Sequence, residues 1–470
     1  MKKNLILFLS AITLAFTSCS DDDNSKSATS SVAFSVASAN LTDATTPVQI
    51  LFSEPTSKAG TVTLSYTTTA VTYGTDFTTN PAAEANTLVI PFDANASSVS
   101  FTFTKLAEAV EGEVKNVVFK ITAVSIDTSI TGNTTTQLNF NETASSGQAL
   151  APETGGANQE NQVFVDLSSG MMTTVPRVSW DLGFYAGSEF RVALNSSVKM
   201  SVKELETTNI DEVQIEDTSM FIMTGSGSVD QIDAPEGLIT GTAIKAISDN
   251  NDNNKVYLLN LGSNPSRTAP AVGSEGSGSG THRGWKKVRI LKSGNDYKIQ
   301  YADLASTTHQ EVTITKDAAY NFTFFSFITN NTVKVEPQKN QWDINFTTFT
   351  NIVNMGTVAP YHYADFVVTN LKGSAKSYQV STSEFAFDKF TAGNVVASKF
   401  TEDQRNIGSN WRGTSVPGAD GNPTSQFVLR TDRFYVIKDA SGNIYKLKFT
   451  GGNNEAGERG FPKFQYFLVK

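Results

Sequence analysis

Hydrophobic and polar residues alternate in short runs along much of this chain, with turn-forming residues between the runs. Alternation with a period of two is typical of strands that bury one face. The first such runs, for example residues 32–36 and 62–66, lie within residues 31–143. Their spacing predicts a β-sandwich of about seven strands. Residues 144–161, rich in Ser, Gly, Ala and Asn, are interpreted as a linker to the next part of the chain.

A five-residue motif, Trp-Asp-aliphatic-x-Phe, occurs twice after that linker, at 180–184 and 342–346. On a strand, its Trp, aliphatic and Phe side chains share one face, and its Asp points to the other. A second pair of similar segments follows, at 294–301 and 442–449. Each of these begins with Gly-Asn and continues as an alternating run, which is typical of the turn and outgoing strand of a hairpin.

These two ordered pairs predict that the C-terminal part is a duplicated β module. Its first half is expected at residues 162–332 and its second half at 333–470. Chance resemblance between short motifs is the alternative, and the nearly equal separations of the two pairs disfavour it. The pattern leaves open whether the halves pair across a pseudo-twofold axis or lie apart as beads.

Composition supports an all-β fold and excludes some function classes. The 470 residues suffice for two or three domains with real cores. Charged residues make up 18% and aromatic residues 10% of the chain, a mixture that favours strands over helices. The net charge is −9 and no basic run occurs, so nucleic-acid binding is not expected. A single cysteine excludes a disulfide framework and a cysteine-based zinc site.

Residues 1–19 are interpreted as a lipoprotein signal peptide. Two lysines precede an apolar run over 5–16, which is too short for a membrane-spanning helix. The segment that ends at Cys19, the only cysteine, resembles a lipobox, which implies lipidation of Cys19. The polar linker 20–30 begins with Ser-Asp-Asp-Asp and resembles the acidic export signal of Bacteroidetes-type lipoproteins. We therefore expect a protein anchored to the outer membrane by lipid alone and facing the cell exterior.

The N-terminal domain resembles the Calx-beta domain. The resemblance rests on Tyr-Gly-Thr-Asp-Phe at 73–77, the Asp-Ala-Asn turn at 93–95 and the acidic segment 108–113. It implies a possible calcium site on loop carboxylates, for which Glu54, Asp76 and Glu111 are the candidates. Because acidic residues are sparse there and a hard cation needs many oxygen ligands, a spacer or adhesion-like module is the better interpretation.

The C-terminal part resembles the HmuY-type proteins, which are haem-binding lipoproteins of Bacteroidetes. The resemblance rests on the duplicated Trp-Asp motif, Phe-Val-Val-Thr-Asn at 366–370, the hairpin at 439–449 and Gly-Phe-Pro-x-Phe-x-Tyr at 460–466. It implies an all-β fold that holds haem between loops. It also implies a haemophore-like role in haem acquisition, in which haem passes to an outer-membrane haem receptor.

Axial ligands for haem iron are usually His, Met, Cys or Tyr side chains. The candidates are His362, which lies between two tyrosines, Met355, seven residues earlier, and His282 in a glycine-rich segment. Arg283, next to His282, is the candidate partner for a haem propionate, and His309 is the weakest candidate ligand. Each histidine could instead be an ordinary loop or strand-edge residue.

One feature departs from the family pattern. No His or Met follows His362, so the loop 408–424 offers no such ligand. Ligation could use the first half, or a mixed pair such as His362 or Met355 with His282. A different ligand is the remaining possibility.

No catalytic motif of the common hydrolase, metalloprotease or nucleotide-binding kinds occurs, so we do not expect an enzyme. The alternative to haem binding is a non-enzymatic surface protein for adhesion or glycan binding. That alternative predicts that aromatic residues such as Trp411 or Tyr361 lie on an exposed face.

Overall fold

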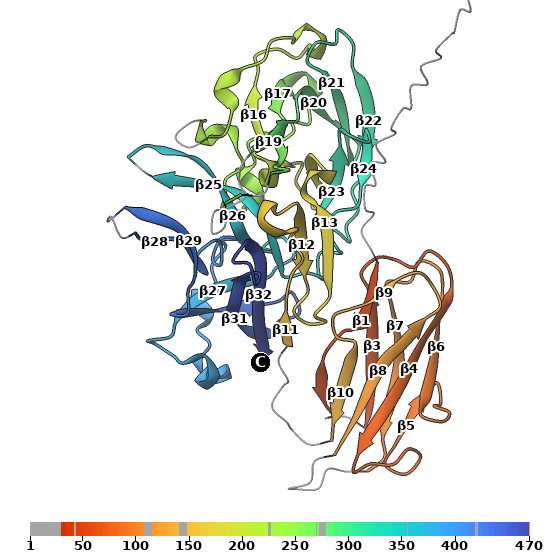
Figure 1. Cartoon of the computed structure of the whole chain (residues 1–470). Helices are drawn as coiled ribbons and strands as arrows, with labels where there is room; N and C mark the ends of the chain where they lie inside the picture. Colours follow the sequence, from red (N-terminus) through yellow and green to blue (C-terminus); the bar gives the residue numbers. More distant parts are fainter. Residues whose placement is uncertain are drawn as a thin grey trace, which may run out of the picture.

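The computed structural model describes residues 30–41, 44–107, 115–140, 148–223, 227–268, 270–271, 279–354, 356–418 and 422–469. Cys19 and the leader, Glu111 and Met355 lie outside these residues. Over the described residues the fold is all-β, with short 3₁₀ turns and no α-helix (Figure 1). Accordingly, no described segment forms a helix that is long and apolar enough to cross a bilayer.

The N-terminal domain is a β-sandwich, as expected, but its two five-stranded sheets contain more strands than the predicted seven. In spatial order, the first sheet contains β5 (Phe77–Asn80), β7 (Ser98–Lys105), β3 (Thr45–Phe52), β1 (Ser31–Phe34) and β9 (Ser129–Ile130), and the second contains β2 (Ser38–Asn40), β10 (Thr135–Asn139), β8 (Asn116–Val124), β4 (Gly60–Thr69) and β6 (Thr87–Phe92). The alternation along β4 has its expected result, because Val62, Leu64 and Tyr66 are all buried in the sandwich core.

Two of the calcium candidates make ordinary protein contacts. The Glu54 carboxylate forms an ion pair with Lys334 of the C-terminal part, at 2.7 Å. The Asp76 carboxylate accepts a hydrogen bond from the Thr72 amide, also at 2.7 Å. No cluster of three potential metal ligands is present among the described residues. Glu54 thus joins the sandwich to the C-terminal part, as does Asn133, whose side-chain amide donates to the Ser168 carbonyl.

The C-terminal part contains four larger sheets and two hairpin-like pairs, whose strands have the following spatial order. They are β11 (Gln148–Leu150), β32 (Arg459–Leu468), β31 (Ile444–Asn453), β30 (Arg433–Lys438) and β27 (Lys376–Ser381); β13 (Met172–Pro176), β12 (Asn161–Val165), β25 (Ile344–Asn354) and β26 (Val358–Thr369); β15 (Val192–Leu194), β14 (Leu182–Tyr185), β23 (Phe322–Ser326) and β24 (Asn331–Val333); β16 (Ser201–Glu204), β17 (Val256–Asn260), β20 (Trp285–Ser293), β21 (Asp296–Asp303) and β22 (Gln310–Ile314); β18 (Ser263–Pro265) with β19 (Ser279–His282); and β28 (Arg412–Pro417) with β29 (Pro423–Leu429).

Short 3₁₀ turns connect these strands. They are η1 (Gly156–Asn158), η2 (Arg177–Ser179), η3 (Ser196–Val198), η4 (Ile210–Glu212), η5 (Thr218–Met220), η6 (Val229–Gln231), η7 (Ile239–Gly241), η8 (Asn251–Asn253), η9 (Phe387–Lys389), η10 (Ala392–Asn394) and η11 (Ala397–Lys399). The Gly-Asn prediction is confirmed, since Gly294 and Asn295 join β20 to β21 and Ser293 pairs with Asp296. Gly294 has φ +63°, a value that favours glycine.

The two halves of the duplicated module exchange strands. Strand β12 pairs with β25, which carries the second Trp-Asp motif, and Phe164 lies opposite Asn345. Strand β23 pairs with β14, which carries the first motif, and Phe324 lies opposite Gly183. Strand β23 stands two strands before the second motif strand, as β12 stands two strands before the first, although β23 lies ahead of residue 333, the expected start of the second half. With β23 counted as the opening strand of the second half, the opening strand of each half completes the motif sheet of the other half. The halves are interlocked rather than arranged as beads.

The side chains of the Trp-Asp motif divide between two cores, contrary to the expectation of one shared face. Leu182 and Phe184 are buried in the core of the first half. Trp180 lies before the strand begins and packs edge-to-face on Phe324, with ring centroids 4.7 Å apart. Trp342 packs in the same way on Phe164, at 5.0 Å. Both tryptophans therefore belong to one aromatic cluster at the boundary between the halves.

Candidate functional site

Two hairpins, β25–β26 and β28–β29, project from the same side of the C-terminal part (Figure 1). Their bases are joined by Trp411, which is 1% exposed. Its indole N–H donates to the Asp365 carbonyl at 3.0 Å, and its ring stacks on Phe449 with centroids 4.3 Å apart. The carboxylate of Asp365 forms buried ion pairs with Arg412 and Arg459. The hairpins thus start from a rigid, desolvated base.

His362 lies on β26, opposite Thr350 of β25, and is half-buried. The Thr350 hydroxyl donates to the Ser196 carbonyl at 2.9 Å and lies 3.2 Å from His362 Nδ1. Because that donation uses the only hydroxyl proton, Nδ1 must carry the proton in the His362–Thr350 bond. The lone pair is then on Nε2, which has no hydrogen-bond partner among the described residues.

The surroundings of His362 also keep its ring uncharged. Burial lowers the pKa of His362 well below its ordinary value, and the positive charges of Lys199 and Arg177 lower it further. A neutral imidazole with an oriented Nδ1–H and a free Nε2 is the form that binds transition metals. Of the three histidines, His362 has the geometry closest to that of a metal ligand.

His282 lies at the end of β19 and contacts a different set of residues. Its Nε2 is 2.9 Å from Asn260 Oδ1, and its ring packs near Phe221 and Trp285. The Asn260 oxygen can only accept, so Nε2 carries the proton and Nδ1 holds the lone pair. Burial lowers the pKa of His282. Nδ1 is the more crowded nitrogen because it lies next to the ring carbon that bears Cβ.

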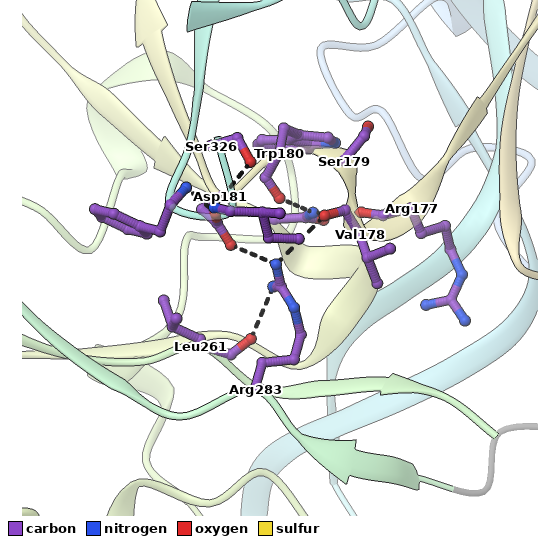
Figure 2. A network of polar contacts seen from close by, with 12 residues as sticks. Arg177, Val178, Ser179, Trp180, Asp181, Leu261, Arg283 and Ser326 are labelled. Carbon is purple, nitrogen blue, oxygen red and sulfur yellow. Dashed lines mark hydrogen bonds and ion pairs between the residues drawn. The ribbon is translucent and has the colours of Figure 1, made fainter. Parts of the chain in front are cut away.

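Arg283, the candidate propionate partner, points into the protein (Figure 2). Its guanidinium forms an ion pair with Asp181 of the first Trp-Asp motif, at 2.7 Å, and both side chains are almost fully buried. It also donates to the carbonyls of Leu261 and Val178, at 3.0 and 3.4 Å. A propionate could reach this guanidinium only by displacing Asp181.

The candidate ligands are not brought into one cluster. His309 Nδ1 lies within hydrogen-bond distance of the Asp211 carboxylate, at 3.0 Å, and the side chain is a quarter exposed. No hydrogen bond or ring contact joins any two of the three histidines in the described parts of the chain. The proposed ligand sets therefore stay predictions, and Met355 stays outside the described residues.

A cavity of about 150 Å³ lies at the boundary between the halves, and the sequence did not predict it. Its aromatic lining consists of Phe164, Trp180, Phe322, Phe324, Trp342 and Phe349. Its charged lining residues are Asp233, Glu336 and Lys372. The motif that ends at Asn370 is two residues from Lys372 and is the only sequence signal near this cation. We call this space the boundary cavity.

The charged residues of the boundary cavity have perturbed pKa values. Burial raises the pKa of Glu336 to about 7 and that of Asp233 to about 6, although backbone amides stabilise both carboxylates. Burial lowers the pKa of Lys372 to about 8, against the opposing effect of Asp233 and Glu336. At pH 7 the lysine is therefore mostly protonated, while Glu336 is close to half protonated.

Comparison with protein families and solved structures gives the following similarities. The family described as HmuY protein matches the chain twice, at residues 158–315 and 318–466. Solved structures that match include the apo form of the Calx CBD1 domain, at 12% identity over 23% of this chain and 96% of that chain, with a TM-score of 0.20. CBD12 from CALX1.2 matches at 10% identity over 31% of this chain and 75% of that chain, with a TM-score of 0.20.

A two-domain protein of unknown function from Bacteroides fragilis also matches. It is 7% identical over 73% of this chain and 92% of that chain, with a TM-score of 0.19. A search among curated proteins found no match.

Proposed function

The chain belongs to the HmuY family, and from that premise we propose that it binds haem at the cell surface and delivers it to an outer-membrane receptor. The observation that carries the proposal is the double family match, which includes both Trp-Asp motifs. The family is of the haem-binding type and is not an enzymatic one. A role without catalysis is therefore part of the proposal.

His362 is the axial ligand that the geometry supports best. Thr350 fixes the tautomer by accepting the Nδ1 proton, and it can do so because its own proton is donated to Ser196. The depressed pKa of His362 keeps its ring neutral at physiological pH, so no proton has to leave before iron binds. His282 and Met355 remain candidates for the second ligand, whereas Arg283 fits a propionate poorly because Asp181 already occupies it.

The test is a titration of haemin into the mature chain, followed by absorbance. A Soret band should appear and saturate at a fixed stoichiometry. His362→Ala should shift or abolish the band. Thr350→Val, which removes the acceptor for Nδ1–H, should weaken binding by about 10- to 100-fold. His309→Ala is the matched control, because the polar partners of His309 are the acids Asp211 and Glu311 rather than another candidate ligand, and it should bind haemin like the wild type.

Two results would count against the proposal in different ways. An unchanged spectrum for His362→Ala would remove His362 as the ligand. Absence of any Soret band with the wild-type chain would mean that this member of the family has a different ligand.

We also propose that Cys19 is lipidated and that the protein faces outward from the outer membrane. The apolar run before Cys19 and the acidic residues after it support this location. In cells that produce the full chain, Cys19→Ser should abolish labelling by a fatty-acid analogue. Protease added to intact cells should degrade the wild-type protein, and full protection from that protease would contradict an outward-facing location.

The alternative of glycan binding lacks the exposed aromatic residues that it predicts. Trp411 is buried at the base of the hairpins. Tyr361 is half-buried and packs on Tyr363, with ring centroids 4.8 Å apart. Neither residue lies on an exposed face, so haem remains the better supported ligand.

A further inference from the structure

The boundary cavity is lined by equivalent residues from the two halves, because strand exchange places them face to face. Phe324 lies opposite Gly183, as Phe164 lies opposite Asn345. An equivalent polar contact also occurs in both halves. The Asn195 side chain donates to the Trp180 carbonyl, and the Asn370 side chain donates to the Trp342 carbonyl, both at 2.8 Å. Residues that line the cavity in one half can therefore be compared with the equivalent residues of the other half.

The two halves differ at the indole nitrogens. Trp180 Nε1 donates to Gln162 Oε1 at 2.9 Å. By the strand register, the residue equivalent to Gln162 is Phe322, which has no acceptor. Trp342 is 8% exposed, and its Nε1 is buried without a partner among the described residues. A buried N–H without an acceptor costs free energy, so an acceptor inside the cavity would be favourable.

The halves differ again at the residue between the aliphatic and Phe positions of the motif. The first half has Gly183, where a Cβ would lie only 3.3 Å from atoms of the Phe322 and Phe324 rings. The second half has Asn345, which is 5% exposed and lines the cavity. Its Oδ1 is buried and has no donor among the described residues. Two residues of the second half that line the cavity thus carry buried polar atoms without partners among the described residues: an acceptor on Asn345 and a donor on Trp342.

Lys372 adds a positive charge to the same cavity. Its ammonium lies 5.8 Å from the centre of the Phe322 ring and forms no hydrogen bond or ion pair with the described residues. The neighbouring carboxylates are held by the backbone. Asp233 accepts from the Leu194 and Ala243 amides, and Glu336 accepts from those of Asn321 and Phe322. The ammonium therefore remains available to an anion.

We propose that the boundary cavity binds a small aromatic carboxylate that also carries a hydroxyl or amino group. The carboxylate would accept from Lys372 and from Trp342 Nε1, and the hydroxyl or amino group would donate to Asn345 Oδ1. Its ring would lie among the aromatic side chains. The volume limits the ligand to about one ring, because an apolar protein cavity of about 150 Å³ holds benzene. A porphyrin, with four pyrrole rings, does not fit, so this site is separate from haem binding.

The experiment is calorimetric titration of the mature full-length chain with 4-hydroxybenzoate and with benzoate as probes. The wild type should bind 4-hydroxybenzoate more tightly than benzoate, because only the former can donate to Asn345. Lys372→Met should weaken binding of both probes by about 10- to 100-fold, the usual effect of losing a hydrogen bond to a charged group. Lys376→Met is the matched control, since Lys376 pairs with Glu402 and is absent from the cavity lining, and it should leave binding unchanged.

A second variant separates loss of the site from loss of the fold. Asn345→Gly copies the residue at the equivalent place in the first half. It should remove the preference for 4-hydroxybenzoate over benzoate while benzoate still binds. Binding should also tighten as pH falls from about 8 to about 6, because all three charged lining residues take up protons over this range. Glu336 and Asp233 lose negative charge, Lys372 gains positive charge, and each change favours a bound carboxylate.

Three results would overturn the proposal. The first is an absence of heat with either probe at millimolar concentration, which would mean that the cavity holds water only. The second is equal binding of the probes by Lys372→Met and the wild type. The third is an unchanged probe preference in Asn345→Gly. The haemin spectrum of Lys372→Met should match that of the wild type, so failure of this proposal and failure of the haem proposal can be told apart.

Discussion

The two aspartates of the Trp-Asp motif are buried in different ways. One carboxylate oxygen of Asp181 forms an ion pair with Arg283 at 2.7 Å, and the other accepts a hydrogen bond from the Phe327 amide. Asp343 accepts from the equivalent amide, that of Leu167. Its neighbour is an acid, Asp166. Burial, and then the negative charge of Asp166, raise the pKa of Asp343 well above its ordinary range. The same motif residue is thus a charged partner in one half and an acid favoured in its neutral form in the other.

This contrast predicts the effect of removing Arg283. Arg283→Met should lower the free energy of unfolding by about 3–5 kcal/mol, because it leaves the Asp181 carboxylate buried without its cation. The double variant Asp181→Asn with Arg283→Met should recover much of that loss. Chemical denaturation of the wild type, of Arg283→Met, of Asp181→Asn and of the double variant gives the coupling between the two residues.

The same variants show whether Arg283 also serves haem. The double variant keeps a stable fold but lacks the guanidinium. If it binds haemin like the wild type, Arg283 is a structural residue only. A large loss of haemin affinity in the stable double variant would instead support the propionate role expected from the sequence.

At the scale of elements, the hairpin β25–β26 depends on a turn from the other half of the module. The Thr348 and Thr350 hydroxyls of β25 donate to the Ser197 and Ser196 carbonyls of η3, at 2.7 and 2.9 Å. The second of these bonds sets the tautomer of His362. The orientation of the best candidate ligand is therefore determined by a contact between halves that are far apart in sequence.

Local features of the elements could be predicted from the sequence, and their long-range partners could not. The alternation at Val62, Leu64 and Tyr66 and the turn at Gly294 depend only on neighbouring residues, and both predictions are confirmed. Periodicity identifies a strand but does not name the strand with which it pairs, so the exchange of β12 and β23 was not foreseen. For the same reason the contact between Arg283 and Asp181 could not be predicted from the sequence.

The boundary cavity could not be predicted from the sequence, because its unpaired polar groups arise from differences between the two copies. A duplicated motif draws attention to what is shared, such as the Trp and Asp residues. The unpaired groups arise where the copies diverge, at Phe322 in place of an amide and at Asn345 in place of a glycine. These differences acquire meaning only when the strand register shows which positions are equivalent.

For the whole molecule, strand exchange makes each half dependent on the other. The core of the first half includes Phe325 and Phe327, which come from the chain segment that opens the second family match. The core of the second half includes Val163 and Val165 of β12. Loss of a buried phenylalanine side chain costs about 3–5 kcal/mol, and whole domains are stable by only about 5–15 kcal/mol. Neither half therefore has enough of its own core to fold alone.

The dependence of each half on the other can be tested by dividing the chain between them. A chain cut after Asp317, in the exposed loop between β22 and β23, should divide into fragments 30–317 and 318–470 that lack a cooperatively folded C-terminal unit when separate. Mixed together, the fragments should regain a cooperative unfolding transition, because every strand pairing of the intact chain can form between them. Circular dichroism and thermal unfolding of each fragment, of the mixture and of the intact chain measure this. A sharp transition from the module portion of either fragment alone would contradict the requirement for exchange, whereas recovery only on mixing would show that β12 and β23 hold the duplicated module together.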